Sequence, residues 1–415
     1  MQSLSIHRLY FLGLLFWWIS IPFSMGLANV GLAVTSLISL FIIRQHGLTE
    51  LKKLVFHPGT VLFFLCSLSL IWSNDKWFAL SEIKTHLPIF LSMLCVFAGV
   101  MLDSTLIRKG FICLTFSCGL AVLVTILFNI LPYEQSLKLH GLFGSLLQPF
   151  YKSDHTFFGW YVPFMVRTQF GNLLSLVGLT GLVLGLVERK TVWIIGSLFF
   201  LVMVFVLGLR GSAIGILMAL PFLMNLSFKN QVQQVLSMKT IVVVGIILIP
   251  LCYFASDSVK GRWHQTKFEW SAINNNSYTQ YDYTHFTLLT RLVSWKNGLE
   301  LWQKHPLIGT GIGDYKSDFS ETYENDAIKV PLYYHSQWLY FLGVFGLTGT
   351  VLLLSFIVYW IRSFKEHSVA YYFGLGIFIY YFVIWVFDAG MLSQTDMMSF
   401  GIFTSFVPWL QKTYK

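Results

Sequence analysis

One polar stretch decides the fold of this 415-residue chain: residues 257–337, which begin with DSVKGRWHQTKFEW at Asp257 and end with PLYYHSQ at Gln337. The rest of the chain is overwhelmingly apolar. Hydrophobic residues make up 55% of the sequence and charged residues only 11%, against about 25% charged residues in soluble domains. This composition indicates a polytopic membrane protein, and its one long polar segment is where we expect the chemistry to lie.

Uncharged runs long enough to cross about 30 Å of hydrocarbon predict an all-α membrane bundle of about twelve transmembrane helices. Nine runs precede the polar stretch and three follow it. We therefore expect helices one to nine in residues 1–256, one large loop in residues 257–337, and helices ten to twelve in residues 338–415. The expected spans are residues 9–25, 27–43, 59–73, 87–102, 111–132, 168–187, 191–209, 212–226, 240–256, 338–361, 370–387 and 396–410.

The distribution of Lys and Arg predicts the orientation. If both termini lie on the inner side, fourteen of the 28 Lys and Arg residues fall in inner segments and six in short outer segments. The other eight lie in the long loop, which the charge rule does not count, so the loop should face outward. The net charge of +9 then belongs to the inner face, where it favours contact with anionic membrane lipids over binding of nucleic acid.

Within the polar stretch, one predicted helix carries a cation on its buried edge. Apolar residues recur there at steps of three and four: Leu288, Leu292, Trp295, Leu299 and Trp302. The spacing predicts an amphipathic helix that Pro306 ends. Arg291 lies one turn before Trp295, so it is more than a solvated charge. No strand precedes the Gly309-Thr-Gly-Ile-Gly313 segment, which favours a tight turn over a phosphate-binding loop.

Other outer cations also need an explanation. Arg210 separates two apolar runs, and its neighbours Gly208 and Gly211 let a backbone or a ligand approach closely. Lys84 and Arg167 each stand near the start of a span, where a cation can simply anchor the helix. Together with Arg291 these side chains could converge on one anion. His335 stands at the mouth of the tenth span, a place where a lone His is more often a packed residue than a catalyst.

The order and spacing of these motifs resemble the signature of the O-antigen ligase and polymerase superfamily. Three of them lie in and after the loop: Arg291-x3-Trp-x2-Gly, Pro306-Leu-Ile-Gly-x-Gly-x-Gly and His335-x2-Trp-Leu-x6-Gly. Leu209-Arg-Gly-Ser resembles the family's Ser-Arg-Gly segment with Leu in place of Ser, and His335-Ser336 stands where His-Asn is usual. Asp388-Ala-Gly-Met-Leu-Ser-Gln394 is similar to a segment of the ligase-like branch. With the twelve-span layout, the resemblance covers nearly the whole chain.

The resemblance implies a membrane-embedded, inverting glycosyltransferase without metal or cofactor, multi-pass in the bacterial inner membrane, with its active site facing the periplasm. Its donor would be a glycan linked to undecaprenyl diphosphate. Its acceptor would be a hydroxyl of a glycolipid or glycan, such as lipid A-core. Arg210 and Arg291 would bind the diphosphate, with Arg167 and Lys84 as weaker helpers, because fixed positive charge stabilises a departing anion. His335 would orient or deprotonate the acceptor hydroxyl.

Three other functions stay open. An O-antigen or exopolysaccharide polymerase shares the signature, and the sequence alone separates it poorly from a ligase. A protein O-oligosaccharyltransferase is less favoured, because no further soluble region follows the last predicted span. A lipid-linked-oligosaccharide transporter would also need a cationic cavity, but transporters more often show internal repeats and helices broken near mid-membrane, and no convincing repeat is seen here.

Overall fold

The structure is a computed structural model that describes residues 2–46, 54–143, 147, 160–229, 257–275, 287–321 and 334–414. These residues contain helices and no strand, which confirms the all-α class. The helices are α1 (Gln2–Ser20), α2 (Met25–His46), α4 (Pro58–Ser69), α5 (Lys76–Leu102), α6 (Ser104–Ile130), α7 (Tyr133–Phe143), α8 (Arg167–Glu188), α9 (Thr191–Val206), α10 (Arg210–Lys229), α12 (Asp257–Asn274), α13 (Thr287–Lys304), α14 (Tyr315–Glu321), α15 (Gln337–Arg362), α16 (Ser368–Phe387) and α17 (Gln394–Thr413), with a 3-10 turn at Gly390–Leu392.

Six of the described helices are long and apolar enough to cross a membrane: α2, α5, α6, α8, α15 and α16. Shorter apolar helices are α4, α9 and residues 210–225 of α10. The protein is therefore a helical membrane protein. The expected ninth span, residues 240–256, lies outside the described residues, so the count of twelve spans and the three-part division of the chain stay predictions.

Two helices begin earlier than the sequence predicted, because an aspartate caps each of them. α5 begins at Lys76 rather than at residue 87, and the Asp75 carboxylate accepts a hydrogen bond from the Phe78 N–H at 2.8 Å. α6 begins at Ser104 rather than at residue 111, and Asp103 accepts from the Thr105 N–H at 2.8 Å. Such caps satisfy N–H groups that a helix start leaves without partners. Both helices therefore include charged residues that lie outside the uncharged runs from which the spans were predicted.

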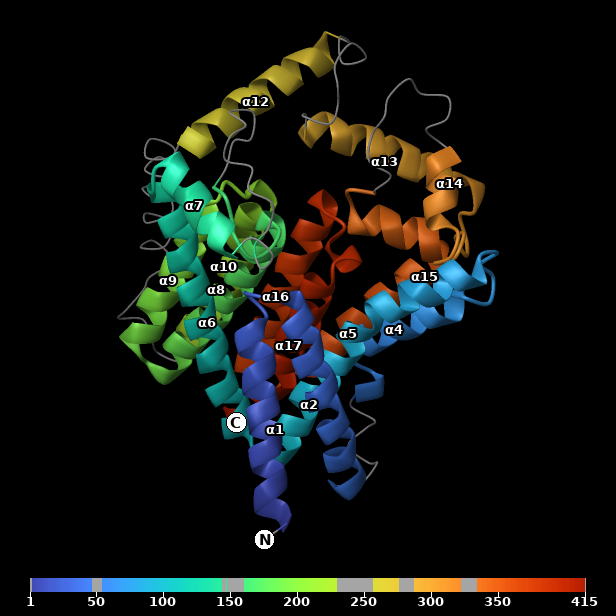
Figure 1. The fold of residues 1–415 in the computed structure, drawn as a ribbon. Helices are drawn as coiled ribbons and strands as arrows, with labels where there is room; N and C mark the ends of the chain where they lie inside the picture. Colours follow the sequence, from blue (N-terminus) through green and yellow to red (C-terminus); the bar gives the residue numbers. More distant parts are fainter. Residues whose placement is uncertain are drawn as a thin grey trace.

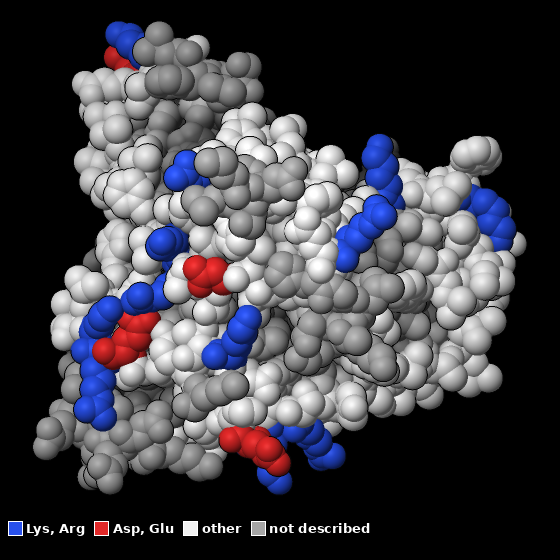
Figure 2. Space-filling model, turned by 90° about the horizontal axis from the view of Figure 1, so that it is seen from below, with Lys and Arg blue, Asp and Glu red and all other residues white. Residues whose placement is uncertain are grey.

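The apolar helices form one body, and the helices of the polar stretch lie across one end of it (Figure 1). Both chain termini lie at the opposite end. α10 packs along α16, α5 along α17, and α8 along α9, while α8 is the most enclosed of the six candidate spans, with 94% of its apolar window buried. Seen from the end with the termini, the surface carries more Lys and Arg than Asp and Glu (Figure 2). Figures 1 and 2 together show that both termini lie at the end of the protein where Lys and Arg outnumber Asp and Glu.

α15 is broken at Gly346, and the glycine-rich segment after α13 fills the break. Gly346 has φ 64° and ψ −170°, a backbone conformation that is essentially confined to glycine. Backbone hydrogen bonds join the two segments: Leu347 N–H to Pro306 O (2.9 Å), Thr348 N–H to Leu307 O (3.1 Å), Thr310 N–H to Gly343 O (2.8 Å) and Gly311 N–H to Val344 O (3.0 Å). The polar stretch is thereby fixed to the membrane body beside the start of α15.

The same glycine-rich segment is also fixed to the connection between α4 and α5. The Ile312 N–H donates to Ser69 Oγ at 3.2 Å and the Gly313 N–H to Ser73 Oγ at 3.0 Å. The Asp314 carboxylate accepts from the backbone N–H groups of the α5 cap, Asn74 at 2.6 Å and Asp75 at 2.9 Å. The N–H groups of residues 310–313 are thus bonded within the protein. The segment is a structural turn rather than a phosphate-binding loop.

Gly346→Ala should lower the free energy of unfolding by about 1–3 kcal/mol or more, because 1–3 kcal/mol is the usual cost of a strained backbone conformation. A Cβ at this position would also clash with the Leu307 carbonyl group. Thermal unfolding in detergent would measure the effect. Gly196→Ala in α9 is the matched control, because a Cβ there meets nothing within 4 Å. Equal melting temperatures for the two variants would contradict the role of the break.

Candidate active site

Arg210 is placed by the turn between α9 and α10. Gly208 takes φ 69° in this turn, a conformation that explains the need for glycine, and α10 begins at Arg210 itself. The side chain reaches α12, where Nη1 donates a hydrogen bond to Thr266 Oγ1. Two opposite charges act on this guanidinium, the repulsive one of Arg291 and the attractive one of Glu269. Arg210 remains partly exposed, so a ligand can reach it.

Arg291 connects α13 to the end of α16. Its Nε donates to the Phe387 carbonyl oxygen at 2.7 Å. Phe387 is the last residue of α16, and the last carbonyls of a helix carry partial negative charge. The side chain is half-buried, but the apolar face predicted next to it is not the buried one, since Leu292 and Leu299 are exposed. Arg291 therefore points from the polar stretch toward the membrane body.

His335 lies immediately before α15 in a left-handed conformation, with φ 47°, which is uncommon for a residue other than glycine. Neighbouring contacts fix this backbone. The Trp295 indole N–H of α13 donates to the His335 carbonyl oxygen at 3.2 Å, and Ser336 Oγ donates to the Trp385 carbonyl oxygen at 3.2 Å. Burial, together with the charge of Arg291, lowers the pKa of His335 from 6.5 to about 4. The imidazole is therefore neutral at physiological pH.

Three of the four predicted cations come together, and the fourth does not. The positive charge of Arg210 repels that of Arg167, the first residue of α8. The positive charge of Arg291 repels that of Arg210 in the same way. We call Arg167, Arg210 and Arg291 the arginine cluster. Lys84 instead lies exposed within α5, and no hydrogen bond or ion pair among the described residues links it to the cluster. The predicted helper role of Lys84 therefore gains no support from its position.

A buried polar network begins five residues after Arg167 and two residues after Arg210, and no motif in the sequence marked it. Asn172 of α8 is its centre. Its Oδ1 accepts from Ser212 Oγ of α10 at 2.8 Å and from the Tyr380 hydroxyl of α16 at 3.1 Å, while its Nδ2 donates to Asp396 Oδ1 of α17 at 3.1 Å. Ser393 Oγ donates to Asp396 Oδ2 at 2.8 Å. The network joins four helices, so it fixes the helix starts that carry Arg167 and Arg210.

Glu269 of α12 is a second residue that the sequence analysis missed. Its side chain is fully buried. Oε2 accepts from the backbone N–H groups of Leu288 at 2.6 Å and Leu289 at 3.1 Å, in the first turn of α13. A carboxylate at a helix N-terminus is favourable because it meets free N–H groups and the positive end of the helix dipole. Glu269 thus ties α12 to the helix that carries Arg291.

The ligase-like segment after α16 lies against the His335 segment. The fully buried Gln337 follows His335 by two residues, and its Oε1 accepts from the Met391 N–H at 2.9 Å. At the end of the same segment, Gln394 Oε1 accepts from Asn29 Nδ2 of α2 at 2.9 Å. Two motifs that are distant in sequence therefore meet at one place.

A cavity of about 260 Å³ opens near the start of α8. Its wall combines polar and apolar side chains, among them Gln169, Ser393, Gln394, Thr395, Met25 and Phe164. Gln169 follows Arg167 by two residues, so the cavity adjoins the helical turn that carries one member of the arginine cluster. Amide and hydroxyl groups without a charged side chain suit an uncharged ligand that carries hydroxyls.

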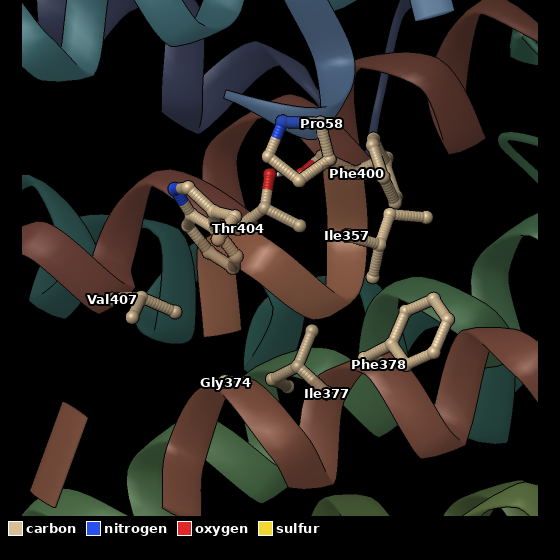
Figure 3. A pocket seen from close by; sticks show the side chains of 9 residues that line it. Pro58, Ile357, Gly374, Ile377, Phe378, Phe400, Thr404 and Val407 are labelled. Carbon is tan, nitrogen blue, oxygen red and sulfur yellow. Dashed lines mark hydrogen bonds between the residues drawn. The ribbon is translucent and has the colours of Figure 1, made fainter. Parts of the chain in front are cut away.

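A second gap lies where α4, α15, α16 and α17 meet (Figure 3). It is lined by Pro58, Ile357, Phe378, Phe400 and other mostly apolar residues, and its volume is about 10 Å³. A water molecule alone needs about 10–15 Å³, so this gap is a packing defect rather than a substrate site. The described residues include no group of three or more His, Cys, Asp or Glu side chains placed to share a metal ion.

Part of the chain is similar to a known protein family. Residues 195–354 match a family model described as O-antigen ligase. The matched region contains Arg210, Arg291 and His335, whereas Lys84 and Arg167 precede it. No curated protein matches the chain. From α9 to the middle of α15, then, this membrane protein is similar to the O-antigen ligase family, which is consistent with the O-antigen ligase and polymerase superfamily.

Proposed function

We propose that this protein is a ligase-type glycosyltransferase that moves a glycan from undecaprenyl diphosphate to an acceptor hydroxyl, such as one on lipid A-core, on the periplasmic face of the bacterial inner membrane. One observation carries the proposal: the arginine cluster and a neutral His335 lie together, although they come from α8, α10, α13 and the residue pair before α15. The family of the matched domain supports the same class of reaction.

The arginine cluster suits a diphosphate. Like charges that lie close together destabilise the unliganded site, and an anion with several oxygens relieves that repulsion. Guanidinium groups offer paired donors that match phosphate oxygens, and they keep their charge at any relevant pH. When the glycosidic bond to the diphosphate breaks, its electron pair moves to the departing phosphate oxygen. Positive charge fixed in advance at that oxygen lowers the barrier for the step.

His335 suits the acceptor. The acceptor oxygen would attack the anomeric carbon on the face opposite the diphosphate, so the product has inverted configuration. A sugar hydroxyl is too weak an acid to ionise beforehand, so its proton would pass to His335 as the new bond forms. The low pKa of His335 keeps the imidazole neutral at physiological pH, so its lone pair is free, but it also makes His335 a weaker base than an ordinary His. General-base help is worth about 10²–10⁴-fold and is greatest when the pKa of the base lies near the working pH.

The sugar nearest the diphosphate would occupy the cavity near the start of α8. Its amide and hydroxyl side chains can hydrogen-bond to sugar hydroxyls, and its apolar wall can cover a ring face. We favour a ligase over a polymerase because the segment from Asp388 to Gln394, which resembles the ligase-like branch, contacts the His335 segment through Gln337. Supplying the enzyme with either a lipid A-core acceptor or a second lipid-linked glycan would distinguish the two reactions by the product formed.

The proposal requires α12 and α13 to lie on the periplasmic side and both termini in the cytoplasm. A cysteine in place of Asn275, which is exposed at the end of α12, should react with a membrane-impermeant maleimide in intact spheroplasts. A cysteine in place of the exposed Lys365, between α15 and α16, should react only after lysis and is the matched control. The reverse labelling pattern would contradict the orientation and the periplasmic donor.

A further inference from the structure

Glu269 is a buried carboxylate, and its hydrogen bonds within the described part of the chain involve one of its two oxygens. Oε2 caps α13 through Leu288 and Leu289. Oε1 is buried as well, and among the described residues it has no hydrogen-bond partner. Burying an ionised carboxylate is costly unless an opposite charge lies nearby. A helix cap alone does not explain why a charged side chain stands here rather than an amide.

The nearby opposite charge is Arg210. Thr266, which accepts the hydrogen bond from Arg210, precedes Glu269 by three residues on α12, so both side chains lie on one face of that helix. The charge of Glu269 attracts Arg210, whereas that of Arg291 repels it. Arg291 itself stands on α13, three residues after the capped Leu288. Glu269 therefore acts on Arg210 through its charge and on Arg291 through the helix that it caps.

We propose that Glu269 is a positioning residue: an internal counter-ion that holds the arginine cluster together while the site is empty, and that a bound diphosphate replaces as the partner of Arg210. The inference rests on the proposed function and adds regulation of donor and product affinity to it. Because Glu269 competes with the diphosphate for Arg210, it should weaken the binding of undecaprenyl diphosphate after transfer. Product release would then be faster than from an arginine cluster without a counter-ion.

Glu269→Gln tests this role, because glutamine keeps an oxygen that can accept from Leu288 and Leu289 but has no charge. Inorganic pyrophosphate is the probe, and its binding is measured as protection of the purified protein against thermal unfolding. We expect Glu269→Gln to bind pyrophosphate about tenfold more tightly than the wild type, a typical size for coupling between two groups. In transfer assays the donor KM should fall and product inhibition should rise.

Glu300→Gln is the matched control, since Glu300 is exposed on α13 and pairs with Lys296 at 3.7 Å. It should leave pyrophosphate affinity unchanged. Equal pyrophosphate affinity in wild type and Glu269→Gln would overturn the counter-ion role and leave a helix cap. A wild-type protein that binds no pyrophosphate would instead remove the diphosphate site, and the proposed function with it.

If Glu269→Gln does not fold, a double variant still tests the counter-ion role. Removing Arg210 as well, in the double variant Arg210→Gln/Glu269→Gln, relieves the repulsion between Arg210 and Arg291 that the lost carboxylate had offset. A double variant that folds would support the counter-ion role, because only a charge imbalance is repaired in this way. A double variant that stays unfolded would overturn it, because the loss then comes from the cap of α13.

Discussion

Arg291→Ala should lower glycan transfer about 100- to 1,000-fold, the effect of removing one fixed donor from a developing anion. The loss should appear in kcat, because the charge on the diphosphate grows as the glycosidic bond breaks. Arg210→Ala should have an effect of the same order. Arg291→Lys should recover little activity, because an ammonium cannot reproduce the bond to the Phe387 carbonyl together with paired contacts to phosphate. Transfer would be measured in proteoliposomes at equal protein abundance.

Lys296→Ala is the matched control for the arginine variants. Lys296 stands on α13 as Arg291 does, but its side chain is exposed and pairs with Glu300 one turn later. Such surface pairs contribute about 0–1 kcal/mol to stability, so this variant should keep full activity. Near-normal transfer by Arg291→Ala would remove Arg291 from the site. Equal losses in Arg291→Ala and Lys296→Ala would mean that α13, rather than the guanidinium, is what the reaction needs.

His335→Gln should lose nearly as much activity as His335→Ala, about 10²–10⁴-fold, because glutamine can hydrogen-bond but cannot take a proton. The wild-type pH profile should carry the signature of the lowered pKa. The protonated imidazole cannot act as a base, and burial keeps it neutral down to about pH 4. kcat/KM should therefore stay flat as pH falls through 6.5, the ordinary value for His, and should decline only near pH 4.

A His judged from the sequence alone would be expected to lose base activity near pH 6.5, because burial and the neighbouring Arg291 cannot be seen there. A bound diphosphate should partly offset the charge of Arg291, so kcat, which reports the substrate complex, should begin to decline at a higher pH than kcat/KM. Measuring both kcat and kcat/KM from pH 3.5 to 8 would show this order. A fully active His335→Gln variant would disprove the base role and leave the arginine cluster in place.

Local patterns in the sequence predicted several elements of the candidate site. The three- and four-residue spacing of apolar residues predicted a helix that Pro306 ends, and α13 is that helix. Its buried face differs from the predicted one, because Leu289, Ser294 and Leu301 are buried whereas Leu292 and Leu299 are exposed. The Arg210 turn, the loop of residues 306–313 and the position of His335 were each marked by motifs of a few residues. Such features depend on neighbours along the chain, which is why a sequence can reveal them.

Contacts between distant segments were beyond the sequence. Asn172 and Asp396 are separated by 224 positions and meet in the polar network, and Glu269 reaches the start of α13 across 19 positions. Each looked like an ordinary polar residue in its own segment. The helper role of Lys84 stays a prediction. α5 begins earlier than its uncharged run suggested, so Lys84 lies exposed within the helix rather than just before it.

One assay tests the central claim most directly: purified protein in liposomes, given a glycan linked to undecaprenyl diphosphate and a lipid A-core acceptor, with chelator present and no nucleotide. The account predicts that glycosylated acceptor and free undecaprenyl diphosphate appear in a one-to-one ratio, and that both disappear together in Arg291→Ala. Release of undecaprenyl diphosphate without glycosylated acceptor, or acceptor glycosylation that continues unchanged in Arg291→Ala, would contradict it.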